Sequence, residues 1–183
     1  MILEKGSIVD ASIKEAYTTH CSKRDQDARF TSRGKKPYHG YKAHIGIDHQ
    51  SKVTHSTEFT PSNVHDSDMF AHLLTGKEQI VIADKGYANK NRKCHLREAG
   101  IFCGILDKGY RNRLLNPKQK KKNYNLSQIR STVERPFAFA KQILHYDRCR
   151  YYNLARNRFQ FNMVALVYNL RRCMRLIPCP VGG

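Results

Sequence analysis

An apolar run that stops at a carboxylate constrains the fold of this chain more than any other stretch. Residues 79–87 read Gln-Ile-Val-Ile-Ala-Asp-Lys-Gly-Tyr. The part from 80 to 83 is too short for a helix and rich in β-branched residues, which predicts a strand buried on both faces. Asp84 then lies at the carboxyl end of this strand, where open α/β sheets gather ligands and catalytic groups. The alternative is an aspartate that only opens the next turn.

The charge of the chain indicates a polyanionic partner. Its 183 residues include 33 Lys and Arg against 15 Asp and Glu, a formal charge of +18. Such a charge repels itself unless the protein works beside a polyanion, and nucleic acid is the leading partner. An anionic membrane is the rival, but the apolar runs are far too short for a span and no signal peptide opens the chain. We therefore expect a cytoplasmic, nucleoid-associated protein without a membrane partner.

The cysteines and histidines do not form a recognisable metal site. The six cysteines contain no Cys-x-x-Cys pair and no zinc-knuckle spacing, which argues against metal ribbons and dithiol redox chemistry. His44 could pair with His39 or His49, but on a strand these spacings place the two rings on opposite faces. A metal site, if present, is therefore expected to use carboxylates.

A second aspartate lies inside an apolar segment near the amino terminus. Residues 7–13 read Ser-Ile-Val-Asp-Ala-Ser-Ile, with Asp10 at the centre. If this is an interior strand, Asp10 needs a cation or hydrogen bonds, because burying an unpaired carboxylate costs several kcal/mol. The alternative is that Asp10 caps a helix over residues 14–16.

The next hundred residues predict a mixed sheet. Residues 18–37 are basic and lack periodicity, which predicts a loop. Residues 39–48 alternate in polarity, with Lys42 on the polar face, and predict a half-buried strand that pairs with 53–60 in an antiparallel hairpin.

A helix is expected over residues 63–76, because Asn63 and Asp66 have capping-box spacing. We interpret Asp66 and Asp68 as acids of its first turn, outside the catalytic set. A further helix over 89–99 and a strand over 101–106 complete an α/β fold, a mixed sheet with helices packed on its faces.

A basic run follows, over residues 108–122, and it is either solvated surface or a phosphate-contacting loop. We expect one domain over residues 1–176, with basic loops at 18–37 and 108–122, and a flexible tail at 177–183.

The third acid lies in a predicted helix at residues 129–141. Arg130, Glu134 and Lys141 stand at i, i+4 and i+11, along one face of a continuous helix. Pro136 would kink such a helix, so a new start capped by residue 131 or 132 is the alternative. The simplest interpretation of Arg130 and Glu134 alone is an exposed ion pair.

The last predicted helix covers residues 154–176. Its apolar positions recur at helical spacing, and we expect this stripe to pack in the core. The stripe consists of Phe159, Met163, Leu166, Val167 and Leu170.

Three acids in a first strand, at the end of a central strand and on a late helix are the donors that a two-metal phosphoryl-transfer site requires. Oxygen ligands suit Mg²⁺, and a pair of ions activates the attacking oxygen and stabilises the leaving one. Sequence spacing alone does not establish that Asp10, Asp84 and Glu134 converge.

These features resemble the DDE transposases of bacterial insertion sequences, which have a ribonuclease-H-like fold. The resemblance covers about residues 8–176 and rests on residues 9–12, 40–48, 63–67 and 83–87 and on the Arg130-(3)-Glu134-(6)-Lys141 spacing, its most specific part. A tyrosine of the family is replaced by Ser127, which affects an end contact but no metal ligand. Family members also carry a helical DNA-recognition region before the first aspartate, whereas nine residues precede Asp10, so the chain resembles the catalytic part alone.

The resemblance implies that Asp10, Asp84 and Glu134 are catalytic and bind two Mg²⁺ ions, for which Mn²⁺ can substitute, with no other cofactor. Arg130 and Lys141 would contact DNA phosphates. The other residues expected to bind DNA are Lys42, Lys118, Lys120, Lys121 and Lys122. The partners would be transposon ends and target DNA, and a homodimer on DNA is expected because strand transfer at both ends needs two catalytic subunits.

Two other functions compete with cleavage and strand transfer. One is a truncated, catalytically silent remnant that binds DNA and inhibits a full-length transposase. The other is a structural RNA binder, which fits the charge but leaves Asp10, Asp84 and Glu134 unexplained.

Overall fold

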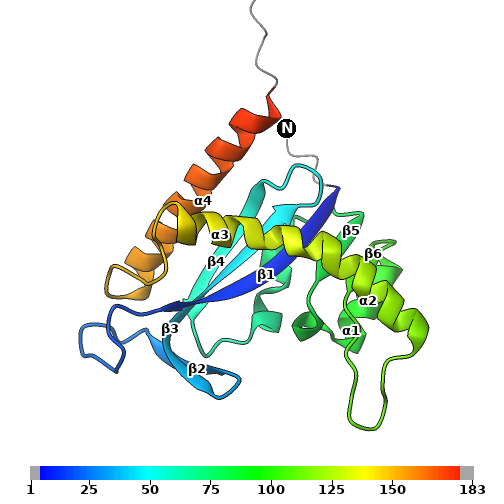
Figure 1. Cartoon of the computed structure of the whole chain (residues 1–183), viewed down its shortest axis with the longest axis horizontal. Helices are drawn as coiled ribbons and strands as arrows, with labels where there is room; N and C mark the ends of the chain where they lie inside the picture. Colours follow the sequence, from blue (N-terminus) through cyan, green and yellow to red (C-terminus); the bar gives the residue numbers. More distant parts are fainter. Residues whose placement is uncertain (1–4, 178–183) are drawn as a thin grey trace, which may run out of the picture.

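The computed structural model describes residues 5–177 and contains a mixed six-stranded sheet flanked by helices (Figure 1). The strands are β1 (Gly6–Glu15), β2 (Arg29–Arg33), β3 (Lys36–Asp48), β4 (Thr54–Pro61), β5 (Ile80–Ala83) and β6 (Phe102–Ile105). Their order is β2-β3-β1-β5-β6, with β4 also paired to β3. The pairs of β3 with β1, β2 and β4 are antiparallel, whereas β1–β5 and β5–β6 are parallel. The predicted α/β class and mixed sheet are therefore confirmed.

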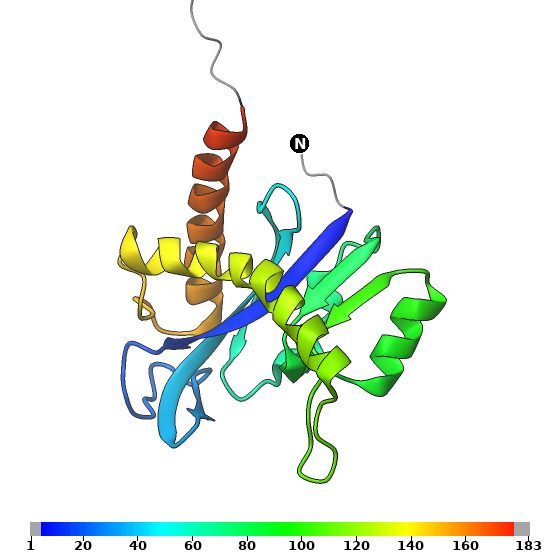
Figure 2. The same cartoon turned by 45° about the vertical axis from the view of Figure 1, so that its right-hand side comes forward.

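The helices lie on both faces of this sheet. They are α1 (Lys90–Glu98), α2 (Pro117–Arg130), α3 (Glu134–Gln142) and α4 (Leu154–Leu176), with short 3₁₀ turns η1 (Asp66–Met69), η2 (Ala71–Leu73), η3 (Lys85–Tyr87) and η4 (Ser131–Val133). In Figure 1, α2 and α3 cross one face of the sheet, and α4 packs beside β4. Figure 2 shows the end of α4 projecting beyond the sheet.

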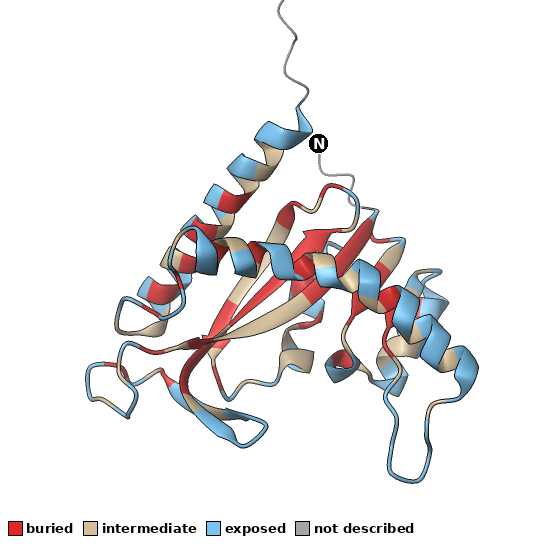
Figure 3. Ribbon diagram, in the orientation of Figure 1, coloured by how far each residue is buried: buried red, intermediate tan, exposed pale blue. Residues whose placement is uncertain are grey.

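Strand β1 separates two hydrophobic clusters. Ile8 belongs to the cluster under α3 and α4, whereas its neighbour Val9 belongs to the cluster on the opposite face, with Leu96 of α1. Figure 3 shows the buried residues concentrated in the central strands between these helices. Because alternate residues of a strand share a face, Asp10 lies on the same side as Ile8.

The two predicted strands that carry aspartates are both present. Val81 and Ala83 of β5 pack in one cluster and Ile82 in the other, so this strand is buried on both faces as predicted. Residues 7–13 lie within β1, which rules out the alternative of a helix capped by Asp10. The parallel register ends with Val9 paired to Ala83. The next residues, Asp10 within β1 and Asp84 directly after β5, therefore lie at the same level of the sheet.

The hairpin of β3 and β4 is confirmed, but β3 is more buried than its alternating sequence predicts. His44 and Asp48, on the polar face, are both 0% exposed. His44 Nε2 lies 2.9 Å from Thr60 Oγ1, and Asp48 Oδ2 accepts hydrogen bonds from the backbone and hydroxyl of Ser51. These bonds satisfy one polar atom of each side chain, whereas His44 Nδ1 and Asp48 Oδ1 have no hydrogen-bond partner within the described residues. A polar pattern therefore did not mean an exposed face.

The loop predicted over residues 18–37 is partly structured. Strand β2 pairs with the beginning of β3, from Arg29 opposite Gly40 to Arg33 opposite Lys36. The preceding segment is fixed by Asp25, which is 2% exposed and accepts hydrogen bonds from the Tyr41 hydroxyl and the Asn153 backbone. A buried carboxylate thus fixes a segment whose polar composition predicted a loop.

The predicted helix over 63–76 is wrong. The structure has two 3₁₀ turns, η1 and η2, and the cap of η1 is His65 instead of Asn63. The hydroxyl of Ser56 in β4 donates to the carbonyl of Leu73 at 2.7 Å, which ties this segment to the sheet before further helical turns can form.

The second predicted loop, 108–122, is helical from Pro117 onward. Asn116 and Gln119 form a reciprocal capping box, and proline at the first helical position needs no hydrogen-bond partner. The lysines from 118 to 122 are therefore presented by the first turns of α2 instead of by a loop.

The segment predicted as one helix over 129–141 is divided into α2, η4 and α3. Pro136 is the third residue of α3, where its missing N–H would have had no partner within the helix. The predicted cap at residue 131 or 132 is wrong: Ser131 ends α2, and Val133 precedes α3 without a side-chain cap.

Helix α4 has the predicted bounds but buries a different face. The residues buried on it are Asn157, Phe161, Val164 and Tyr168. The predicted core stripe is exposed, with Phe159 at 65% and Leu170 at 59%. Of the predicted tail, Ile177 caps the end of α4, and residues 178–183 lie outside the described residues.

Candidate active site

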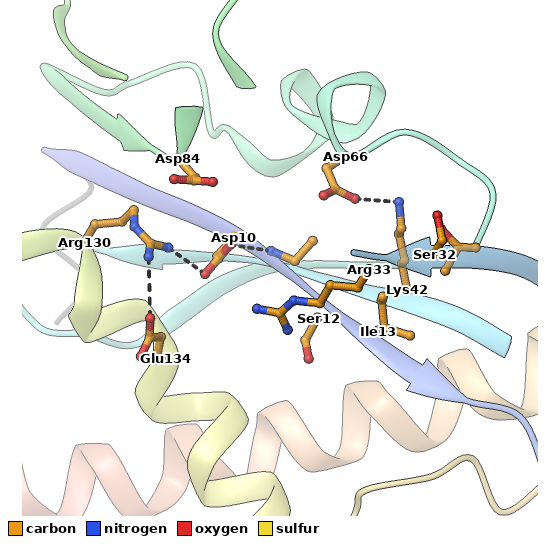
Figure 4. A pocket seen from close by; sticks show the side chains of 12 residues that line it. Asp10, Ser12, Ile13, Ser32, Arg33, Lys42, Asp66, Asp84, Arg130 and Glu134 are labelled. Carbon is orange, nitrogen blue, oxygen red and sulfur yellow. Dashed lines mark hydrogen bonds and ion pairs between the residues drawn. The ribbon is translucent and has the colours of Figure 1, made fainter. Parts of the chain in front are cut away.

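The three predicted acids line one pocket at the end of the sheet. This pocket has a volume of about 340 Å³ and includes Asp10, Asp84 and Glu134 together with Arg130 and Lys42. Figure 4 shows the carboxylates arriving from β1, from the end of β5 and from the start of α3. Side chains separated by up to 124 positions in the sequence, from Asp10 to Glu134, therefore meet at one place.

Arg130 lies between two of the acids. Its Nη1 donates to Asp10 Oδ2 at 3.0 Å, and its Nη2 reaches Glu134 Oε1 at 3.5 Å. Figure 4 shows both interactions. The Arg130 and Asp10 side chains are each 19% exposed, whereas Glu134 is 62% exposed. The predicted surface ion pair of Arg130 and Glu134 exists, but the shorter and more buried bond is to Asp10.

The environment of Asp10 opposes its negative charge. Burial raises the pKa of its carboxyl to about 6, and the Asp84 and Glu134 carboxylates also raise it, against the opposing effects of Arg130 and of the Ala11 amide. A carboxylate crowded by two others is stabilised by a nearby cation. The guanidinium of Arg130 supplies part of that compensation in this structure.

Several polar atoms around the pocket have no hydrogen-bond partner within residues 5–177. They include the Nε of Arg130 and the hydroxyl of Tyr87, both buried. Burial raises the pKa of Tyr87, as do Asp66, Asp10 and Asp84 in that order. Buried groups of this kind are normally satisfied, so the Nε of Arg130, which lines the pocket, is available to a polar ligand.

The donor set fits a divalent metal ion in its chemistry. Asp10, Asp84 and Glu134 offer only oxygen atoms, which Mg²⁺ prefers. In the described part of the chain, however, no three His, Cys, Asp or Glu side chains are close enough to hold a metal ion. The guanidinium of Arg130 contacts both Asp10 and Glu134 and so lies between two of the three acids.

Other predicted DNA-binding residues lie outside the pocket. Lys141 is exposed in the last turn of α3. The lysines of α2 are exposed as well, in its first two turns: Lys118, Lys120, Lys121 and Lys122. Lys42, in contrast, lines the pocket and forms an ion pair with Asp66 at 2.9 Å.

Two contributors to the site were missed in the sequence. Asp66 lines the pocket although it was assigned only to a first turn, and Arg33 lines it from the segment predicted as a loop. No periodicity marks either residue. The position of Asp66 within segment 63–67 was the one available signal.

Arg92 of α1 holds the turns beside the pocket together. Its guanidinium donates to the Ser67 hydroxyl and carbonyl and to the Tyr87 carbonyl, at 2.7 to 2.8 Å, and stacks 4.4 Å from the Phe70 ring centroid. It thus joins η1, which carries Asp66, to η3, which follows Asp84. An arginine on a short surface helix gave no indication of this role.

Two comparisons with known proteins bear on the family and the fold of the chain. A family model described as "Transposase DDE domain" matches residues 3–170. Among solved structures, a piggyBac transposase synaptic complex with hairpin DNA is similar, with a TM-score of 0.51 and 9% sequence identity. The match covers 91% of this chain and 47% of that one, so the chain spans about half the length of this structural relative. The similarity in fold confirms the expected ribonuclease-H-like architecture.

No helix in the described part of the chain combines the length and the apolar character that a membrane crossing requires.

Proposed function

Because the chain belongs to the transposase DDE domain family, we propose that it catalyses phosphodiester cleavage at transposon ends and strand transfer into target DNA. The observation that carries this proposal is the convergence of Asp10, Asp84 and Glu134 in one pocket. Structural and regulatory carboxylates rarely gather from three distant segments, because their mutual repulsion destabilises the fold unless a cation offsets it.

Transposases of this family generally use a divalent metal ion, and we propose that Asp10, Asp84 and Glu134 hold Mg²⁺ here, as two ions for which Mn²⁺ can substitute. Bound there, the metal would lower the pKa of an attacking water and neutralise charge on the phosphate. The side chains of the pocket would supply the rest. Arg130 would turn from the carboxylates toward a DNA phosphate, and Lys42 and Arg33, which line the same pocket, would fix the backbone on the other side.

DNA is the proposed partner, and the nucleoid is therefore the proposed place of action. The charge of +18 suits a duplex, and the structural relative was solved with hairpin DNA. Lys141 and the lysines of α2 would contribute contacts to phosphates that carry no sequence information. Joining two ends requires two catalytic subunits, so we propose a homodimer on DNA, which sedimentation of the protein with and without a duplex would test.

The test of the proposed activity is metal-dependent cleavage of duplex DNA by the chain and by its Asp84→Asn variant. Asp84 is the best position, because its side chain makes no hydrogen bond or ion pair within residues 5–177 and the change removes one charge without breaking a contact. Asp68→Asn is the matched control, since it removes the same charge from an exposed turn.

Mg²⁺- or Mn²⁺-dependent cleavage that is lost in Asp84→Asn and kept in Asp68→Asn is the expected result. A second function, that of a silent DNA-binding remnant, is favoured by the position of Arg130 between Asp10 and Glu134. Salt-sensitive DNA binding without cleavage in any of the three proteins would select that function and reject catalysis.

A further inference from the structure

A second cavity of the molecule is lined by arginines. It is a groove of about 510 Å³ between α3 and α4, and four arginines line it. They are Arg135 of α3 and Arg171, Arg172 and Arg175 of α4. No carboxylate lines this groove, and none of the four arginines takes part in a salt bridge within residues 5–177. We call it the arginine groove.

Two of these guanidinium groups are held in place. The Nε of Arg172 donates to the Ser51 carbonyl at 2.8 Å, which uses one nitrogen and leaves its two terminal nitrogens without a partner in the described chain. Arg171 lies 5.2 Å from the centroid of the Phe139 ring, which also lines the groove. A guanidinium fixed in this way loses little freedom when it binds an anion, so the groove is prepared for one.

The groove also concentrates positive charge that carboxylates offset only in part, because Asp48 is the one acid in the described chain that acts on the neighbouring Lys52. Lys52 lies near it: burial lowers the pKa of its ammonium, and Arg135 and Arg172 lower it further. Cations that depress one another's charge destabilise the folded state, and a bound anion removes that repulsion. Planar guanidinium groups match the oxygens of a phosphate with paired hydrogen bonds.

The groove begins next to the acidic pocket. Glu134 and Arg135 are the first two residues of α3, and Glu134 lines the pocket whereas Arg135 lines the groove. A small anion would need two or three cations, but these four are distributed over two helices. This spread suits a ligand that carries several phosphates in a row.

We propose that the arginine groove binds the phosphate backbone of the DNA on which the chain acts, along a stretch adjoining the one that enters the acidic pocket. The inference rests on the proposed function for the identity of the polyanion, and it assigns to DNA binding a surface distinct from Lys141 and the lysines of α2. Arg135 of α3 and Arg171 of α4 would contact the DNA phosphates from the two sides of the groove, and Arg175 would extend the contact toward the end of α4.

The experiment measures the salt dependence of DNA binding without metal, so that no cleavage occurs. An Arg171→Gln/Arg175→Gln variant should lower the slope of log K against log salt by about 1.8, because each phosphate contact contributes about 0.9. Lys90→Gln/Arg97→Gln removes the same charge from exposed positions of α1 and should leave the slope unchanged. Arg171→Lys/Arg175→Lys keeps the charge and should retain most of the slope while weakening binding.

Folding does not confound this test, because the Arg175 side chain makes no hydrogen bond, ion pair or ring contact within the described residues. Arg175→Gln alone should lower the slope by about 0.9. An unchanged slope in the double glutamine variant, or an equal fall in the α1 control, would overturn the proposal. If cleavage is absent but the slope falls as expected, the groove stands and the catalytic function fails. If cleavage is present and the slope does not fall, the catalytic function stands and the proposal for the arginine groove fails.

Discussion

The first turn of α3 carries two regions of opposite charge on its two sides. On one side Glu134 joins Asp10 and Asp84 in a pocket where acids crowd one another, and on the other Arg135 joins three arginines of α4 in a groove without acids. Like charges repel one another in each region, although Arg130 and Lys42 offset part of the repulsion in the pocket. The pocket lies at the ends of buried strands, and the groove lies between two exposed helices. A cation bound in the pocket and phosphates bound in the groove would each reduce the repulsion between like charges.

The largest expected effect comes from substituting the two adjacent residues Glu134 and Arg135, because one should affect cleavage and the other DNA binding. Glu134→Gln should reduce metal-dependent cleavage more than about 1000-fold, because the metal's stabilisation of transition-state charge is worth several kcal/mol. Arg135→Gln should leave the cleavage rate at saturating DNA unchanged while lowering the salt slope of binding by about 0.9. Single-turnover kinetics and a salt titration on the same two proteins make the comparison, and identical behaviour of the two variants would contradict it.

The groove depends on the packing of α4, which gives the next largest effect. Phe161 is 3% exposed and lies 5.7 Å from the Phe59 ring, so Phe161→Ala should lower the free energy of unfolding by about 4 kcal/mol. Phe159→Ala, two residues away and 65% exposed, should change it by less than about 0.5 kcal/mol. Urea denaturation measures both, and a large loss in Phe159→Ala would mean that its face of α4 is packed after all.

The same helix shows where sequence reasoning reached its limit. Helical periodicity correctly predicted residues 154–176, but two stripes satisfy that period, and the more apolar one is exposed. The buried stripe contains Asn157, whose side chain bonds the carbonyls of Tyr151 and Asn153 and so loses nothing by burial. The sequence favours burial of the more apolar face of α4. The face that is buried in the structure is the one whose polar side chain, Asn157, has hydrogen-bond partners.

For the candidate site, in contrast to α4, the sequence predicted the position of some side chains correctly. Strand β5 and the β1 segment were predictable from short β-branched runs, and their parallel register then brings Asp10 and Asp84 together without further information. The position of Glu134 depends on a break at η4, which Pro136 offered only as an alternative to one continuous helix and with the wrong cap. The roles of Arg33 and Arg92 depend on tertiary contacts alone. Local patterns therefore predicted the strands of the pocket, and only the structure showed how its other sides are closed.

Acid should weaken the sheet beside the pocket and leave the arginines charged. Burial lowers the pKa of His44 to about 4, from 6.5, so the folded protein resists the proton that the unfolded chain accepts. The stability from His44 is complete above about pH 6.5 and falls by about 3 kcal/mol as the pH drops to about 4. Unfolding free energies of His44→Gln should lack this fall, whereas those of His20→Gln, changed at an exposed histidine, should keep it.

Four acids line the pocket, and the smallest expected effect decides whether three or four of them bind metal. Asp66 lines it but is paired with Lys42 at 2.9 Å, and its side chain is 39% exposed. Because a partly exposed ion pair is worth at most about 1 kcal/mol, Asp66→Asn should slow cleavage no more than about 5-fold. Asp84→Asn, measured in parallel under the same metal concentration, should abolish it. If Asp66→Asn loses as much activity as Asp84→Asn, and more metal restores it, Asp66 belongs to the metal-binding acids. Lys42 would then be the cation that pairs with Asp66 when no metal is bound.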